Sequence, residues 1–251
     1  MYAYPTNFTD EMIDAVATIP NLARYIDIPL QHASDNMLEK MRRRVTAKHQ
    51  RDLIGRLRQR SPDFAVRTTF ITGFPGETEA DHQALLEFVE SMRFEMMGVF
   101  EYSREEGTVA GTMDEDPNLF VPPEVKARRR EELMLLQQRI AFEKAEALAA
   151  KFDENAPESG ARFDVLIDAP LADPGAGRET RASRRVKSFH TYQGRTYFQA
   201  PQIDSVTTVR SRKPLSVGEL VRCVIVESDG YDLIAAPIED LDRKVSLSVV
   251  R

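Results

Sequence analysis

Six residues suited to ligand binding stand at the ends of two strand-like segments: Gln31, His32, Arg67, Thr69, Gly73 and Phe74. Amide, imidazole, guanidinium and hydroxyl groups can hydrogen-bond a small molecule, glycine lets a ligand approach the backbone, and an aromatic ring can stack on a base. His32 has no second metal ligand at a useful spacing, so the pattern predicts no metal site. The elements around these residues must decide between binding and purely structural roles.

The structural alternatives are specific. Gln31 and His32 could be polar residues that stabilise a turn. Arg67 and Thr69 share one face of a strand, and if that face lies inside a barrel, Arg67 is a buried charge that needs an anionic partner. That partner could be a carboxylate on a ligand or an acidic side chain of the protein, and the residues alone leave both open.

The segment Val66–Thr78 predicts a strand, a tight turn and the start of a helix. Its first half is rich in β-branched residues, Gly73 ends the strand, Pro75 disfavours helix just before itself, and Thr78 can cap the helix. In α/β proteins such a junction lies at the carboxyl edge of the sheet, where ligands bind. No Lys-Ser or Lys-Thr pair follows the glycines, so the segment is not a phosphate-binding P-loop.

Strands and helices alternate through the first half of the chain. The expected strands are 2–5, 25–30, 66–72 and 97–102, and the helices between them begin after the caps Thr9, Ser34, Thr46 and Thr78. Alternation at this short spacing predicts right-handed βαβ crossovers and a parallel sheet.

The second half of the chain has a different pattern. Pro123 starts a predicted helix that runs to about Lys151, and Arg128–Arg130 are expected on its solvated surface. Alternating segments then predict a small antiparallel barrel with strands at 162–167, 195–199, 220–226 and 231–235. We place the domain boundary between residues 152 and 153, giving domains 1–152 and 153–251.

A basic tract interrupts the predicted barrel. Residues 169–190 are rich in Gly, Pro and Ser, and five cations fall between positions 178 and 187: Arg178, Arg181, Arg184, Arg185 and Lys187. The composition predicts a loop. It could be a basic arm for RNA or ribosome contact, because basic segments bind phosphates, or a solvated insertion.

Composition limits the class of protein. The net charge of −6 argues against a protein that coats nucleic acid generally, and no apolar run approaches the length of a membrane span. The start of the chain lacks the order of a signal peptide, so we expect a cytoplasmic protein without a membrane partner. A single cysteine, Cys223, excludes an internal disulfide and any iron–sulfur cluster held by this chain's own thiolates.

Several short strings are spread over most of the chain: Tyr4–Thr6, Asp27–Ser34, Arg67–Phe70, Gly73–Glu77, Gly98–Phe100, Tyr102–Thr108 and Ala200–Asp204. Together they resemble one family, the radical S-adenosylmethionine methylthiotransferases. Within the family, the His-Ala-Ser of residues 32–34 and the Arg-Thr-Thr-Phe of residues 67–70 resemble the branch that modifies ribosomal protein S-12.

The resemblance implies a fold and an activity. The fold would be an α/β protein: the carboxyl-terminal part of a partial βα (TIM-like) barrel, then an OB-like TRAM barrel. The intact family uses S-adenosylmethionine and two [4Fe-4S] clusters to place a methylthio group on the β-carbon of an aspartate. Gln31, His32, Arg67, Thr69, Gly73 and Phe74 would then bind the cofactor, with no catalytic residue among them.

The resemblance also implies partners and a state for this chain. The cluster ligands of the family have no counterpart here, so the chain is expected to be a carboxyl-terminal fragment that is colourless and inactive alone. The expected partner is ribosomal protein S-12 or the small ribosomal subunit, a basic target that suits the negative net charge. RNA contact through the TRAM barrel and the 178–187 loop is also expected. Two alternatives stay open: a tRNA adenosine methylthiotransferase, and a non-catalytic RNA- or ribosome-binding remnant.

Overall fold

The computed structural model describes residue 5, residues 8–171 and residues 189–241. Two sequence predictions fall partly or wholly outside these residues: the strand at 2–5 and the basic loop at 178–187. The chain divides into two compact units, residues 1–141 and residues 142–251, which we describe separately.

The first unit contains a parallel sheet of three strands, in the order β1-β2-β3. The strands are β1 (Tyr25–Gln31), β2 (Ala65–Thr72) and β3 (Met96–Glu101). The pairing of β1 with β2 and of β2 with β3 is parallel throughout, which confirms the alternation predicted from the sequence. All three carboxyl ends therefore lie at one edge of the sheet.

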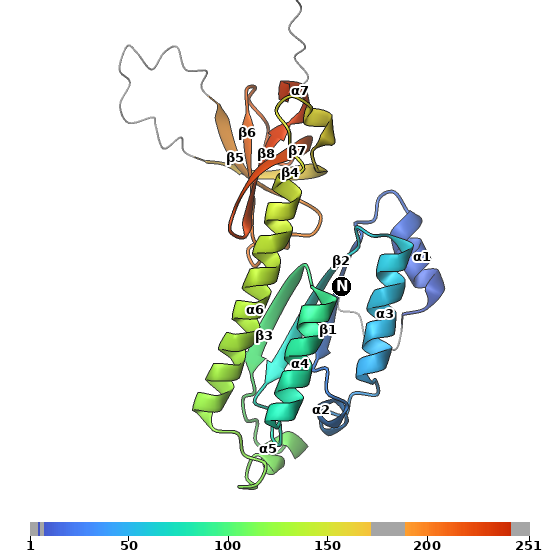
Figure 1. Cartoon of the computed structure of the whole chain (residues 1–251), viewed down its shortest axis with the longest axis vertical. Helices are drawn as coiled ribbons and strands as arrows, with labels where there is room; N and C mark the ends of the chain where they lie inside the picture. Colours follow the sequence, from blue (N-terminus) through green and yellow to red (C-terminus); the bar gives the residue numbers. More distant parts are fainter. Residues whose placement is uncertain (1–4, 6–7, 172–188, 242–251) are drawn as a thin grey trace, which may run out of the picture. The chain divides into compact units, whose positions relative to one another are not determined.

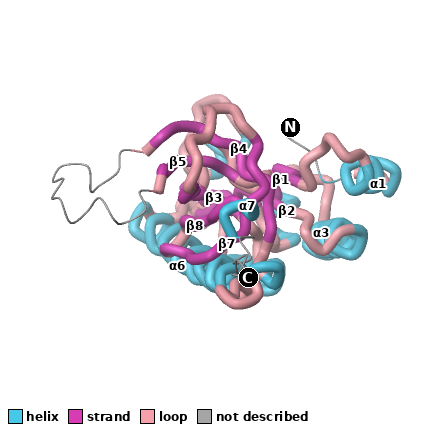
Figure 2. The backbone as a smooth tube through the Cα atoms, turned by 90° about the horizontal axis from the view of Figure 1, so that it is seen from above, coloured by secondary structure: helices cyan, strands magenta, loops and turns pink. Residues whose placement is uncertain are grey.

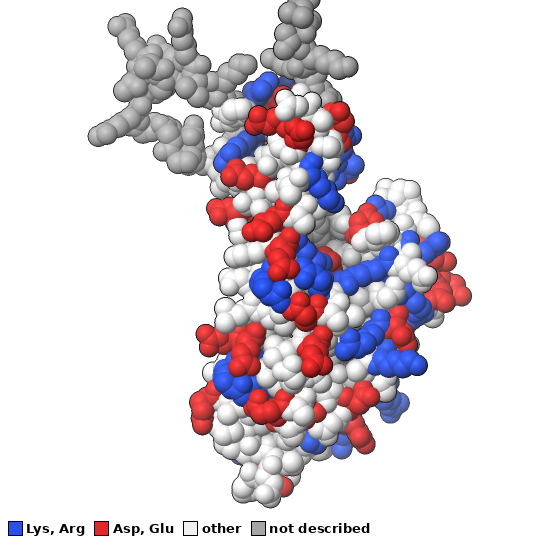
Figure 3. Space-filling view, viewed as in Figure 1, with Lys and Arg blue, Asp and Glu red and all other residues white. Residues whose placement is uncertain are grey.

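Helices connect and flank these strands (Figure 1): α1 (Asp10–Thr18), α2 (Asp35–Lys40), α3 (Ala47–Arg60), α4 (Glu79–Met92) and α5 (Val109–Met113). Thr9, Thr46 and Thr78 cap α1, α3 and α4 through their hydroxyl groups, as predicted. Figure 2 shows α1 and α3 side by side at one end of the sheet. In Figure 3, Lys and Arg side chains gather over α3, and Asp and Glu side chains lie beside them.

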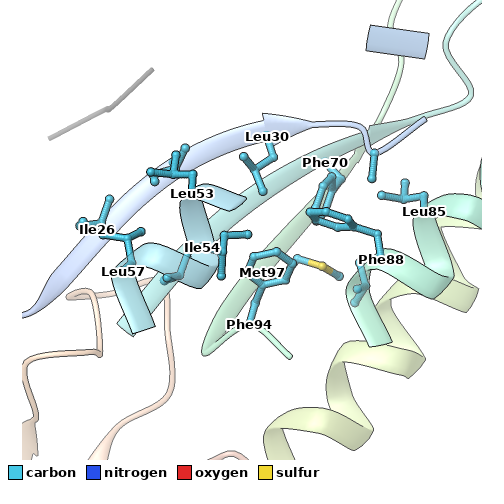
Figure 4. Packing of buried hydrophobic residues seen from close by; sticks show 14 of the residues in the cluster. Ile26, Leu30, Leu53, Ile54, Leu57, Phe70, Leu85, Phe88, Phe94 and Met97 are labelled. Atoms are coloured by element: carbon cyan, nitrogen blue, oxygen red, sulfur yellow. The ribbon is translucent and has the colours of Figure 1, made fainter. Parts of the chain in front are cut away.

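The alternation of buried and half-buried residues along β2 gives the sheet two different faces. Val66, Thr68 and Phe70 are fully buried, and Phe70 meets the rings of Phe88 and Phe94 at centroid distances of 6.3 and 5.9 Å. Figure 4 shows these rings packed with aliphatic residues of α3 and α4. Burying each large apolar side chain contributes about 2 kcal/mol, so this face fixes the position of β2.

The opposite face of β2 carries Arg67, Thr69 and Ile71, which are only half-buried. Since side chains alternate along a strand, the packing of the apolar face sets the direction of these three. They lie on the face of the sheet opposite to the apolar core around Phe70.

The long helix α6 (Pro123–Ala149) contributes to both units. Leu133 and Ile140 lie in the core of the first unit, and Ala145 lies in the core of the second. None of the described helices has the length and apolar character needed to span a membrane.

The second unit is a closed barrel with strand order β4-β5-β6-β8-β7. After the short 3-10 helix η2 (Pro157–Ser159), the elements are β4 (Arg162–Pro170), β5 (His190–Arg195), β6 (Thr207–Ser211), β7 (Leu220–Asp229), β8 (Asp232–Pro237) and α7 (Ile238–Leu241). The predicted barrel is confirmed, with one parallel contact, between β6 and β8.

One predicted barrel strand is wrong and one was missed. Residues 196–199 form a turn, because Gln199 Oε1 accepts hydrogen bonds from the backbone N and the hydroxyl of Thr196. The aromatic residues of this turn, Tyr197 and Phe198, pack on Phe163 instead of alternating along a strand. The strands in this region are β5, which ends at Arg195, and β6, which was not predicted.

Candidate functional site

The carboxyl edge of the β1-β2-β3 sheet carries a pocket of about 650 Å³. Helices α2 and α5 lie just beyond this edge (Figure 1). The wall is formed by the last residues of the three strands and by the segments that follow them: Pro29, Gln31, Lys40, Met41, Arg42, Thr69, Ile71, Phe74, Phe100, Glu101, Tyr102, Ser103, Val109 and Ala110. This is the position at which parallel α/β folds bind ligands.

Three of the six predicted site residues line this pocket: Gln31, Thr69 and Phe74. Thr69 projects from the open face of β2. Gln31 is the last residue of β1 and has a left-handed backbone, with φ of 66°, where the pairing with β2 shifts register. Such a conformation is costly for a residue other than glycine, and strain of this kind occurs often at functional sites.

Phe74 is held by a second aromatic residue of the wall. It is 8% exposed, and its ring meets the Tyr102 ring edge to face at 5.2 Å. The preceding Gly73 has φ of 72°, and a Cβ atom at that position would lie 2.8 and 2.9 Å from Lys126 Cδ and Cβ. Glycine is therefore required on two grounds, backbone conformation and close approach of α6.

His32 lies behind the pocket wall, fully buried. Its Nδ1 accepts hydrogen bonds from the backbone N of Ala33 at 2.9 Å and of Ser34 at 3.0 Å, so the ring proton lies on Nε2. Nε2 faces Glu77 Oε1 at 3.3 Å. Both ring nitrogens are engaged within the protein, which makes His32 a residue that shapes the turn after β1.

Glu77 is the centre of a buried hydrogen-bonded cluster. Beside His32, its carboxylate accepts from the Gly73 amide, and Arg129 Nη1 of α6 lies 3.0 Å from Oε2. Burial alone would raise the pKa of Glu77, but the His32 hydrogen bond, the Arg129 charge and the Gly73 amide hold that pKa below its ordinary value. The cluster ties the ends of β1 and β2 to α6.

Asp81 makes a second connection between the same elements. It completes a capping box with Thr78 at the start of α4, and it also accepts hydrogen bonds from the Ser34 hydroxyl and, at 2.9 Å, from Asn36. Ser34 was predicted to cap α2; it occupies that position, but its side chain bonds to Asp81 instead. The β1–α2 and β2–α4 turns are therefore held together.

Arg67 has an acidic partner on the neighbouring strand. Its Nη1 lies 3.1 Å from Asp27 Oδ2, and the two side chains are 15% and 16% exposed. The sequence left open whether the anionic partner of Arg67 is a ligand carboxylate or an acidic side chain, and the structure shows an acidic side chain. Arg67, His32 and Gly73 thus surround the pocket without lining it, and their role in binding stays a prediction.

The roles of Glu77 and Arg129 were not predicted from the sequence. Arg128–Arg130 were expected on the solvated surface of α6, and this is wrong for Arg129, which is 3% exposed. The available signal was helical periodicity, because Arg129 shares a stripe with Lys126, Leu133, Gln137 and Ile140, all of them buried.

Cys223, the sole cysteine of the chain, is buried in the barrel. It lies in β7 with no exposed surface, and burial, with Asp164 and Asp240 nearby, raises the pKa of its thiol to about 12. Among the described residues, no group of three or more His, Cys, Asp or Glu side chains is placed to hold a metal ion.

Comparison with known proteins links both units to family models. Residues 2–89 match the model of the radical SAM superfamily, and residues 160–238 match that of the TRAM domain. Among curated proteins, the ribosomal protein uS12 methylthiotransferase RimO of Lachnoclostridium phytofermentans is 41% identical over 233 residues, which cover 93% of this chain and 46% of that protein. RimO of Desulfitobacterium hafniense is 38% identical over 239 residues, covering 95% of this chain and 47% of that protein.

The chain therefore spans about half the length of the curated relatives it matches. The match to the radical SAM model covers β1 and β2, with Gln31, Thr69 and Phe74 of the pocket wall, and the match to the TRAM model covers the barrel strands. Over nearly its whole length the chain is similar to RimO proteins, and separate parts of it match the radical SAM superfamily model and the TRAM domain model.

Proposed function

We propose that this chain is part of a methylthiotransferase that modifies ribosomal protein uS12 at the β-carbon of an aspartate. The observation that carries the proposal is the similarity to RimO proteins over 93% of the chain, at 41% identity. The fold alone would not support the assignment of a substrate, because one fold can host many different reactions. Identity at this level across two different domains supports a shared activity.

We assign S-adenosylmethionine to the carboxyl-edge pocket. Gln31, Thr69 and Phe74 offer an amide, a hydroxyl and an aromatic ring on its wall, a set suited to a nucleoside with polar substituents. When bound, this cosubstrate supplies the methyl group and the radical chemistry. The protein's own part is to bind and orient it and to exclude water from it with the apolar wall residues Ile71 and Phe74.

His32, Arg67 and Gly73 complete the proposed site from behind the wall. His32 and the Gly73 amide bond to Glu77, which fixes the turn that carries Phe74. Arg67, paired with Asp27, holds β1 against β2 below Thr69. In this assignment the three residues position the binding groups.

The iron–sulfur clusters implied by the family do not fit the residues of this chain. Cluster ligands are thiolates, whereas Cys223 is the sole cysteine, is buried in the barrel and has a pKa raised to about 12. We propose that two [4Fe-4S] clusters are held by residues that this sequence does not include, and that this chain alone transfers no methylthio group.

For partners, we propose uS12 or the small ribosomal subunit, with RNA contact through the barrel. The match of residues 160–238 to the TRAM model supports the RNA contact. The basic loop at 178–187 is a further candidate for RNA contact, predicted from the sequence.

We also propose the domain division 1–152 and 153–251 and a cytoplasmic location. The TRAM match equally suits two alternatives, a tRNA adenosine methylthiotransferase and a non-catalytic RNA- or ribosome-binding protein.

Mass spectrometry of uS12 and of tRNA nucleosides tests the proposal. Both are isolated from cells with the gene for this protein intact, deleted, and restored. We expect the methylthio group on uS12 to be lost on deletion and recovered on restoration, with tRNA nucleosides unchanged. Loss from a tRNA adenosine instead would establish the tRNA alternative, and no change in either would support the non-catalytic one.

A further inference from the structure

The segment after α2 places an arginine where glycine is usually found. The Arg43 amide donates to Leu38 O at 2.8 Å and the Arg42 amide donates to Glu39 O at 2.9 Å, the two bonds of a Schellman motif at the end of α2 (Asp35–Lys40). In this motif Arg42 takes the left-handed position, with φ of 54°. Glycine is favoured there because a side chain strains the backbone. A strained arginine at this position suggests that its side chain has a use.

The Arg42 side chain lies on the wall of the carboxyl-edge pocket and is exposed. Within the described part of residues 5–141, it is the one arginine whose side chain has no hydrogen bond, ion pair or ring contact; all the others have one. Lys40, also on this wall, differs because its Nζ donates to Gly76 O at 2.9 Å. A free guanidinium is therefore presented to whatever occupies the pocket.

A guanidinium binds carboxylates and phosphates through two parallel N–H donors, and an acidic residue of a polypeptide offers a carboxylate. We infer that Arg42 recognises the carboxylate of the acidic target residue in a polypeptide substrate. This rests on the proposed function and names the residue that selects the substrate.

The surroundings of Arg42 favour a polypeptide over the cosubstrate as the source of the carboxylate. Two other wall residues, Phe100 and Val109, are 64% and 53% exposed, whereas Phe74 is 8% exposed. Exposed apolar side chains beside an exposed cation suit the residues that flank an acidic side chain in a peptide. The less exposed wall around Phe74 remains available to a nucleoside.

A structural role for Arg42 makes an opposite prediction about stability. If its charge mainly stabilises the carboxyl end of α2, then Arg42→Gly lowers Tm. If the residue is kept for recognition, glycine relieves the left-handed backbone, and Tm rises by about 1–4 °C. A thermal melt of the full chain distinguishes the two.

The binding test uses two synthetic peptides: the uS12 segment with the target aspartate, and the same segment with asparagine. Wild type is expected to bind the aspartate peptide about 5- to 10-fold more tightly, a preference that weakens with salt. In Arg42→Gly the ratio is expected to fall to about one. Lys48→Gln removes another exposed positive charge, from α3 and outside the pocket wall, and is expected to keep the ratio.

Three results would overturn the inference. The first is an aspartate preference that survives in Arg42→Gly. The second is a wild-type chain that binds both peptides equally, or binds neither. The third is an Arg42→Gly variant that loses S-adenosylmethionine binding but still discriminates between the two peptides. If uS12 is unmodified in cells while the peptide preference depends on Arg42, the proposed function fails, and what is established is carboxylate recognition by Arg42 without the role in selecting the uS12 target.

Discussion

Arg129 Nη1 lies 3.0 Å from Glu77 Oε2, and the two side chains are 4% and 0% exposed. The pair joins α6 to the turn between β2 and α4, 52 residues earlier in the chain. The Glu77 carboxylate also accepts a hydrogen bond from the Gly73 amide and lies beside His32 Nε2. One buried charge pair therefore fixes the turn that carries Phe74 into the pocket wall.

Breaking this pair on one side is expected to be costly. Glu77→Gln leaves the buried Arg129 guanidinium with one acidic partner, the exposed Glu79 carboxylate at 2.8 Å from Nη2, so the free energy of unfolding should fall by about 2–4 kcal/mol, less than for a buried charge left with no anion. Urea denaturation measures it, with the exposed Glu106→Gln as control, for which we expect less than about 0.5 kcal/mol. A loss below about 1 kcal/mol for Glu77→Gln would contradict the buried pair.

The same carboxylate predicts a pH dependence. The pKa of Glu77 is lowered in the folded state, so the unfolded state takes up this proton more readily. The stabilisation is complete well above the unfolded pKa of about 4.3 and is lost as pH falls through the lower folded value. The stability difference between wild type and Glu77→Gln should shrink below about pH 4.3, as urea titrations at several pH values would measure. A difference that grows in acid would reverse the assigned direction.

Gly73→Ala is expected to destabilise the first unit by about 2–4 kcal/mol, from the left-handed backbone and from overlap with the Lys126 stem. Gly55→Ala is a matched control in helix α3, since a Cβ there meets nothing within 4 Å. It should instead stabilise by about 0.5–1 kcal/mol. Thermal melts of both variants test this, and similar effects at the two positions would contradict it.

The Cys223 thiol should be inert in the native protein. Burial raises its pKa to about 12, so almost no thiolate exists at neutral pH. A thiol reagent such as dithionitrobenzoate should react only at the rate of unfolding, and at once in concentrated urea. Fast labelling of native protein would mean that β7 is more accessible than its packing indicates.

Local sequence signals predicted the elements of the first unit well. The strands 25–30, 66–72 and 97–102 correspond to β1, β2 and β3, and three threonine caps are confirmed by their hydrogen bonds. These features depend on residues close in sequence. In the barrel, the segment 195–199 has the alternation of a strand, but its Thr196–Gln199 hydrogen bonds close a turn, and such competition is invisible to periodicity.

The candidate site was predicted only in part, because some of its contacts join residues that are distant in sequence. Gln31, Thr69 and Phe74 could be found because strand ends in a parallel sheet meet at one edge. The pairing of Glu77 with Arg129 and the isolation of the Arg42 side chain depend on residues that are distant in sequence. No local pattern reports which of many arginines is left without a partner.

The most direct measurement of the central claim is equilibrium binding of S-adenosylmethionine to the 251-residue chain. We predict that wild type binds it and that Phe74→Ala weakens binding at least about fivefold, the loss expected for one base–aromatic stack. Phe189→Ala, a matched change at a 44% exposed residue of the second unit, should leave the affinity unchanged. No binding by wild type, or equal affinity in all three proteins, would contradict the assignment of the carboxyl-edge pocket.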